Sequence, residues 1–114
     1  DDFGLHGLTD LQFVEAARKL GERMIVEGGK SLAEKISHGF RLVTSRRPKP
    51  AELAVLESAY RAALKRYAGD EAGALKLLKV GESSYAAEVD VKKLAALAAV
   101  ARLLLNINEA ITKG

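Results

Sequence analysis

Residues 36–60, ISHGFRLVTSRRPKPAELAVLESAY, decide the fold. The segment begins with the second half of an amphipathic helix, since Ile36, Phe40 and Val43 follow one another at the i, i+4 and i+7 positions that share one helix face. Charged residues lie off this apolar stripe. The spacing therefore predicts a helix that ends near Thr44 and buries one face.

Two prolines follow within a basic stretch and divide this helix from the next one. Each proline lacks an amide proton and disfavours helical geometry in the residue before it, so the first helix cannot continue through Pro48. Pro50 is suited to the first position of a new helix, where the amide proton would have no partner and the fixed φ is already helical. Glu52 then lies near the positive end of the helix dipole. The segment predicts two helices joined at a stiff corner.

The remaining sequence is helical by the same criteria, with no credible strand, no internal repeat and no low-complexity tract. Helices are expected over residues 10–27, 32–44, 50–68, 70–80 and from 91 onward, after an irregular lead-in at 1–8 and with a connection at 81–89. Ser31 and Glu34 form a predicted capping box. Gly21 lowers helix propensity by about 1 kcal/mol relative to alanine, so a close packing contact is expected there.

The last helix differs in character from the others. Residues 94–105, LAALAAVARLLL, contain a single charged residue, Arg102. A helix that is apolar on nearly all sides is buried on most of them, so this helix should fill the centre. The polar residues Asn106, Asn108 and Glu109 are expected to end it. The prediction is an all-α fold in which residues 1–114 form a single-domain bundle of about five helices, with the last helix central.

Composition sets limits on function. The 114 residues are 48% apolar and 29% charged, with a net charge of +3 and no cysteine. This composition is typical of a soluble globular domain, and it excludes disulfides, thiolate metal sites and covalent c-type haem attachment in this segment. No apolar run reaches the length of a membrane span, and the start is not a signal peptide. Because the chain does not begin with Met, we expect a fragment or a processed product.

No catalytic, cofactor or metal site is recognisable. His6 and His38 have no histidine or cysteine at ligand spacing. The run Gly28-Gly29-Lys30-Ser31 lacks the spacing and leading strand of a phosphate loop, and is better explained as a helix stop followed by a helix cap. Serines at 83 and 84 have no acid–base partner at an identifiable spacing.

The basic corner allows one alternative, a small helix-turn-helix-like module that binds nucleic acid. Arg46, Arg47 and Lys49 could neutralise phosphates between two helices. Glu52 and Glu57, however, occupy the helix that would have to read a groove. Nucleic acid is therefore an unfavoured partner. The other interpretation has these arginines paired with carboxylates or hydrogen-bonded to the end of the preceding helix.

A separate hypothesis concerns charged residues that adjoin strongly apolar ones. Arg41, Arg47, Arg102 and Glu109 are expected to include a semi-buried ion pair that fixes the last helix against the corner. Residues with a structural or interaction role are predicted to be Arg41, Arg46, Arg47, Arg102, Asn106 and Glu109.

Four segments occur in an order that resembles a known family. They are FVEAARKLGERMI (13–25), FRLVTSRRPKPAEL (40–53), LLKVGES (77–83) and VKKLAALAAVARLLLNINEAITK (91–113). They resemble the C-terminal domain of unknown function of planctomycete-type surface proteins, which often carry an N-terminal cytochrome c-like domain. The matching positions are Phe13 to Arg18, Phe40 to Leu42, Arg47, Pro48, Gly81, Glu82, Arg102, Leu105, Asn106 and Glu109.

The chain departs from the family in two places. Thr9-Asp10-Leu11 stands where the family has an Asn-Asp-Pro-like entry to the first helix, and the haem-bearing C-x-x-C-H segment is absent. Any haem would therefore belong to an upstream domain of a longer protein. The resemblance implies a location in the periplasm or at the cell surface, and it supplies no catalytic residue.

The expected function is a non-catalytic accessory or interaction domain of a large exported, surface-associated protein. Its partners would be other domains of that parent or a separate protein, and its oligomeric state is left open. Besides the nucleic-acid module, a third hypothesis is a lid or substrate-binding part of a larger redox or hydrolytic enzyme.

Overall fold

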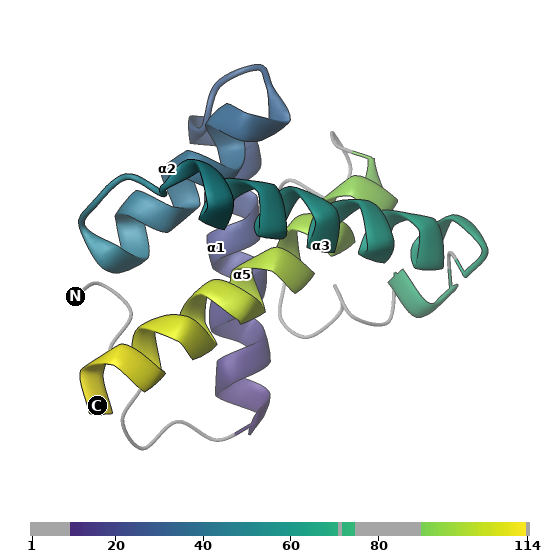
Figure 1. Ribbon diagram of the computed structural model, residues 1–114. Helices are drawn as coiled ribbons and strands as arrows, with labels where there is room; N and C mark the ends of the chain where they lie inside the picture. Colours follow the sequence, from purple (N-terminus) through teal and green to yellow (C-terminus); the bar gives the residue numbers. More distant parts are fainter. Residues whose placement is uncertain (1–9, 71, 75–89, 114) are drawn as a thin grey trace.

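The chain folds as an all-α bundle, as predicted (Figure 1). The computed structural model describes residues 10–70, 72–74 and 90–113, the last five of these by their backbone alone. The helices with defined bounds are α1 (Asp10–Glu27), α2 (Leu32–Thr44), α3 (Pro50–Ala68) and α5 (Val91–Lys113). The described residues contain no strand. The bounds predicted for the first three helices are confirmed.

The connection between α1 and α2 is a helix stop followed by a cap. Gly28 donates its amide proton to the carbonyl of Met24, and Gly29 has a φ of +101°, which a side chain would disfavour. Ser31 and Glu34 then form the predicted capping box, in which Ser31 Oγ accepts from the Glu34 amide at 3.1 Å. The end of one helix and the cap of the next therefore account for the run Gly28-Gly29-Lys30-Ser31, and no phosphate-binding loop is needed to explain it.

The corner between α2 and α3 begins earlier than the prolines. Ser45 adopts the left-handed conformation, with φ of 64°, and its amide proton is donated to the carbonyl of Arg41 at 2.9 Å. The helix is thus closed by a left-handed cap three residues before Pro48. Pro50 is the first residue of α3, as predicted, and Glu52 caps the helix by accepting from the amide of Lys49 at 2.8 Å.

The last helix, α5, is central, as predicted. It passes between α1 and α3 in Figure 1 and also contacts α2. Its fully buried side chains include Leu94, Leu97, Val100, Leu104 and Leu105. All of them except Leu94 belong to one main core shared with the other three helices, whereas Leu94 packs with Ala74 and Ala95 in a smaller cluster. The apolar stripe predicted for α2 faces this core, with Ile36, Phe40 and Val43 buried.

Glycines allow the closest approaches between helices. A Cβ atom on Gly21 of α1 would lie 3.1 Å from the Cα and N atoms of Ala98 in α5, which confirms the close contact expected at Gly21. A Cβ on Gly39 of α2 would lie 2.5 Å from the sulfur of Met24, which fixes the distance between α2 and α1. Backbone contact at Gly21 explains why α1 accepts a poor helix former at its centre.

The predicted end of the last helix is wrong. The helix runs through Asn106, Asn108 and Glu109 to Lys113. Asparagine only weakly disfavours a helix, and neither glycine nor proline occurs before the end of this segment, so polar residues alone do not stop it.

For the fourth predicted helix, the structure describes the cap and first turn. Asp70 accepts from the amide of Gly73, and residues 72–74 are helical. The remainder of that helix, the connection at 81–89 and the lead-in at 1–8, with His6, lie outside the described residues.

Candidate interaction surfaces

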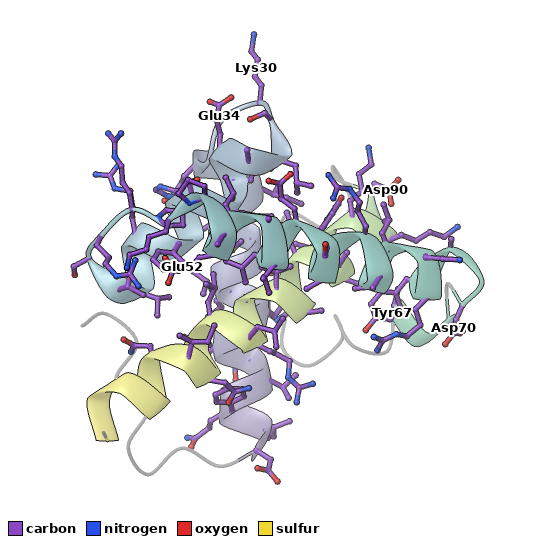
Figure 2. All side chains as sticks on the ribbon, in the orientation of Figure 1. Lys30, Glu34, Glu52, Tyr67, Asp70 and Asp90 are labelled. Carbon is purple, nitrogen blue, oxygen red and sulfur yellow. The ribbon has the colours of Figure 1, made fainter. Side chains whose placement is uncertain are left out.

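Arg46 fixes the corner between α2 and α3. Its guanidinium donates two hydrogen bonds to the Glu52 carboxylate, both at 2.8 Å, and its Cζ lies 4.8 Å from the centre of the Phe40 ring. Figure 2 shows Glu52 beside this corner. These bonds from Arg46, with that from the Lys49 amide, lower the pKa of Glu52 to about 2. Arg46 therefore has a structural role in the corner.

Arg41 and Arg47 come together on the outer side of the corner. Both side chains are exposed and line a shallow cavity of about 450 Å³ with His38 and Glu34. His38 Nε2 lies 2.9 Å from Oε1 of Glu27, and the hydrogen bond with His38 is the largest cause of the lowered pKa of Glu27. Since Glu34, Glu27 and His38 are all close by, this cavity presents mixed charge.

The hypothesis of a semi-buried ion pair among the predicted residues is wrong for the three arginines. Arg41, Arg47 and Arg102 are exposed and lie on two different surfaces. The Glu109 side chain lies outside the described residues. Residues beside apolar segments in the sequence can face away from them, because a helix turns by about 100° per residue.

The ion pair that is buried joins Arg18 and Glu22 within α1. Their side chains are 3% and 9% exposed, and Arg18 Nη1 donates to Glu22 Oε1. The i, i+4 spacing is shared with the exposed pair Glu15–Lys19, so spacing alone could not have identified it. The available signal was position, since Arg18 follows the buried Ala17 and lies about one helical turn before Gly21, which approaches α5.

A groove between α3 and α5 brings together two of the predicted residues, Arg102 and Asn106. It has a volume of about 480 Å³. Its lining is largely alanine, with Ala59, Ala62 and Ala63 from α3 and Ala99 from α5, and also includes Arg66, Tyr67 and Leu103. The small side chains leave room for a further element to approach both helix backbones.

Both helices of the groove also carry exposed apolar side chains. Leu103 is 41% exposed and Ile107, one turn further along α5, is 40% exposed. Val55, one turn before Ala59 in α3, is 66% exposed. The two helices run in roughly opposite directions in Figure 1.

Positive charge borders this groove. Arg66 and Arg102 both line it, and no acidic side chain is among its described lining residues. Neither guanidinium forms an ion pair within the described part of the chain. Arg66 lies over the Tyr67 ring, with 5.9 Å between Cζ and the ring centre. Sequence reasoning missed Arg66, although alanines at 59, 62 and 63 beside it marked an unfilled face.

The described part of the chain offers neither a metal-ligand cluster nor a helix suited to span a membrane. Residues 10–70, 72–74 and 90–108 contain no group of three or more histidine, aspartate or glutamate side chains arranged to hold a metal ion. Within the same portion of the chain, no helix combines the length and apolar character that a membrane crossing requires.

The resemblance to the planctomycete-type domain depends on residues of several kinds. Phe40 is buried in the core, Arg47 is exposed at the corner, and Asn106 lines the groove between α3 and α5. The match therefore does not coincide with any single site, and family membership stays a prediction. Compared with known protein families, with curated proteins and with solved structures, the chain matches none of them.

Proposed function

We propose that this chain is a non-catalytic interaction domain and that the groove between α3 and α5 binds an amphipathic helical segment carrying carboxylates. The groove, bordered by Arg66 and Arg102, is the observation that carries the proposal. Helices dock in apolar grooves by burying one face. The alanine lining allows close approach, and Leu103 and Ile107 supply exposed apolar surface at the margin.

Charge selects the kind of partner. Arg66 and Arg102 are exposed at the groove without an acidic neighbour in its lining, so carboxylates on the incoming helix would gain bidentate hydrogen bonds. A partner with lysines at the same positions would be repelled. Acidic residues flanking an apolar face are therefore the chemistry that the groove recognises.

The resemblance suggests where the partner comes from. We place the domain in a large exported protein at the periplasm or cell surface, with the acidic helix supplied by another domain of that parent. A haem, where the parent has one, would belong to an upstream domain. The intact mass and visible absorption spectrum of the native protein test this. A long polypeptide with a c-type haem band supports it, whereas a native protein of only these residues without haem contradicts it.

A photo-crosslinker tests the docking. It is placed at Leu103 in the intact parent, with Leu11 of α1 as a control because Leu11 is also exposed, at 64%, and does not line the groove. We expect Leu103 to crosslink to an acidic, helix-forming segment identified by mass spectrometry. Arg102→Glu should lower that yield roughly tenfold, as the loss of a charged pair predicts, and Arg41→Glu should not change it.

The crosslinking has outcomes that would reject the proposal. Equal yields from Leu103 and Leu11, or a captured segment without carboxylates, would show that the groove has no such partner. Equal effects of Arg102→Glu and Arg41→Glu would show that only net charge matters.

The nucleic-acid alternative is weakened by the corner geometry. Arg46, the residue nearest the turn, is engaged by Glu52 and Phe40, which leaves Arg47 and Lys49 to contact phosphates. Binding to duplex DNA that weakens steeply when the salt concentration is raised would favour the nucleic-acid alternative. The enzyme-lid alternative would gain support if the activity of the parent disappeared when this segment alone was removed.

A further inference from the structure

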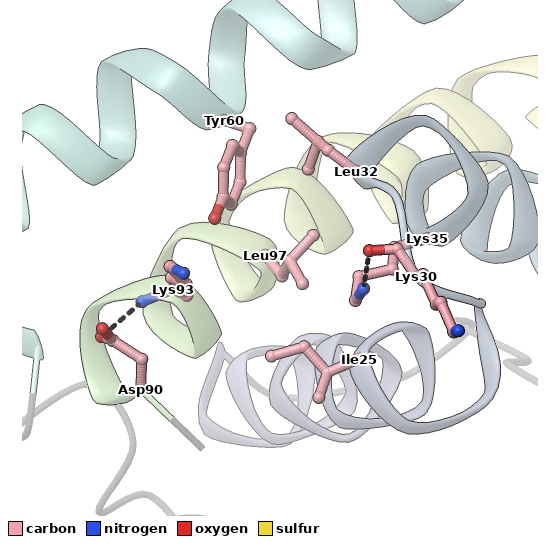
Figure 3. A pocket seen from close by; sticks show the side chains of 8 residues that line it. All are labelled: Ile25, Lys30, Leu32, Lys35, Tyr60, Asp90, Lys93 and Leu97. Atoms are coloured by element: carbon pink, nitrogen blue, oxygen red, sulfur yellow. Dashed lines mark hydrogen bonds between the residues drawn. The ribbon is translucent and has the colours of Figure 1, made fainter.

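A second cavity, on a different surface, lies where α1, α3 and α5 meet the start of α2 (Figure 3). Its volume is about 350 Å³, within the range of small-molecule sites. The apolar part of its wall is made by Ile25, Leu32 and Leu97, one from each of α1, α2 and α5. A rigid wall contributed by three helices is suited to hold a small apolar body.

Tyr60 places a hydrogen-bond donor in this cavity. The residue is 9% exposed, and its hydroxyl, which is not one of the buried polar atoms, makes no hydrogen bond within the described part of the chain. Figure 3 shows the hydroxyl pointing from α3 toward the first turn of α5. Burial and, second, the charge of Asp90 raise the pKa of Tyr60, so the hydroxyl stays protonated at neutral pH. Because the hydroxyl is reached from the cavity and has no partner within the described residues, it can donate a hydrogen bond to a bound ligand.

Positive charge surrounds the polar side of the cavity. The Lys35 ammonium is held in the wall by the carbonyls of Gly29 and Lys30, at 2.8 and 2.9 Å, and has a third proton to donate. Lys93 lines the opposite side, whereas the Lys30 side chain extends away from the cavity in Figure 3.

One acidic group, Asp90, also lines the cavity. Asp90 Oδ1 accepts from the amides of Lys92 and Lys93 at 2.9 and 3.2 Å, so its charge is partly compensated by the start of α5. The two ammonium groups of Lys35 and Lys93 therefore outweigh the single carboxylate, and an anionic group is favoured over a cationic one.

From these features we infer that the cavity is a binding site for a small organic anion with an apolar body, such as a medium-chain or aromatic carboxylate. The apolar body would lie against Ile25, Leu32 and Leu97. The anionic head would accept hydrogen bonds from the Tyr60 hydroxyl and the Lys93 ammonium, and the Lys35 ammonium on the opposite side would add to the positive potential of the cavity. This site is independent of the helix-binding groove, because the two share no lining residue.

Binding is measured on the chain by calorimetry and by amide chemical-shift changes, with octanoate, octylammonium and octanol as probes. We expect octanoate to bind, with shifts at Ile25, Leu32 and Leu97, and octylammonium to bind at least tenfold more weakly. Tyr60→Phe should lower the affinity for octanoate roughly tenfold, as the loss of a hydrogen bond to a charged group predicts. Tyr67→Phe is the matched control, since Tyr67 also lies on α3 but lines the other groove.

Tyr60→Phe is expected to keep the fold, because the hydroxyl has no internal partner to lose. The inference is overturned if octanoate does not bind, if octylammonium binds as tightly as octanoate, or if Tyr60→Phe and Tyr67→Phe bind octanoate equally. Should Tyr60→Phe fail to fold, the comparison of octanoate with octylammonium on the unmodified chain decides the question.

Discussion

Arg18 in α1 allows a quantitative test of the packing between α1 and its neighbours. Its side chain is 3% exposed and paired with Glu22, which is 9% exposed. Replacing Arg18 by methionine keeps most of the apolar stem and removes the charge. The Glu22 carboxylate then stays in the interior without its partner.

The expected loss follows from the burial of the pair. Removing one member of a buried ion pair costs about 3–5 kcal/mol, because the other charge is left uncompensated. With the stem largely retained by methionine, we expect about 3 kcal/mol for Arg18→Met. At about 4 °C per kcal/mol for a domain of this size, Tm should fall by about 12 °C. Arg18→Met combined with Glu22→Leu should recover much of this loss, since the Glu22 charge is removed together with its partner.

The exposed pair one residue along provides the control. Lys19 and Glu15 lie in the same helix and are four residues apart, as Arg18 and Glu22 are, but their side chains are 61% and 39% exposed. Lys19→Met should change the free energy of unfolding by less than about 0.5 kcal/mol. Urea unfolding followed by circular dichroism measures all three variants. Similar small losses for Arg18→Met and Lys19→Met would refute the argument that burial makes the first pair strong.

Two other perturbations test the corner and the contact between α1 and α5. Because the pKa of Glu52 is about 2 rather than 4.5, its pairing with Arg46 stabilises the fold above pH 4.5, and that contribution is lost as pH falls toward 2. The difference in Tm between the unmodified chain and Glu52→Gln should therefore shrink from pH 6 to pH 2. A difference in Tm that stays constant would contradict this role of the pair. Gly21→Val should lower the free energy of unfolding, measured in urea, by about 2–3 kcal/mol, because the new Cβ would lie 3.1 Å from backbone atoms of Ala98. Gly69→Ala is the control and should be neutral or stabilising, because the nearest atom to its Cβ would be 3.9 Å away. Equal effects of the two substitutions would contradict the close contact at Gly21.

Local signals in the sequence predicted the helices well. The Ser31 capping box, Gly28 after α1 and Pro50 at the start of α3 each act through backbone hydrogen bonds within a few residues. Their effect therefore does not depend on the rest of the fold. The predicted end of α5 is wrong, because polar residues such as Asn106 leave the backbone hydrogen bonds of a helix intact.

The candidate sites were predicted only in part. Arg102 and Asn106 were singled out and do lie together, but their neighbour Arg66 is contributed by another helix. The ring of Tyr60 belongs to the main core. Its hydroxyl lies beside Asp90, 30 residues further along the chain, and no pattern within α3 indicates that proximity.

The sequence by itself determined which segments are helical, which face of each is apolar, and that the last helix is central. These properties follow from spacing, capping and composition, all of which act over one or two helical turns. Only the tertiary structure decided that Arg18, and not Arg41 or Arg102, is buried, and that grooves form beside Ala59 and Tyr60. Burial of a charge and the shape of a groove depend on how helices cross, and the contact of Gly21 with Ala98 fixes one such crossing between segments 77 residues apart (98 − 21).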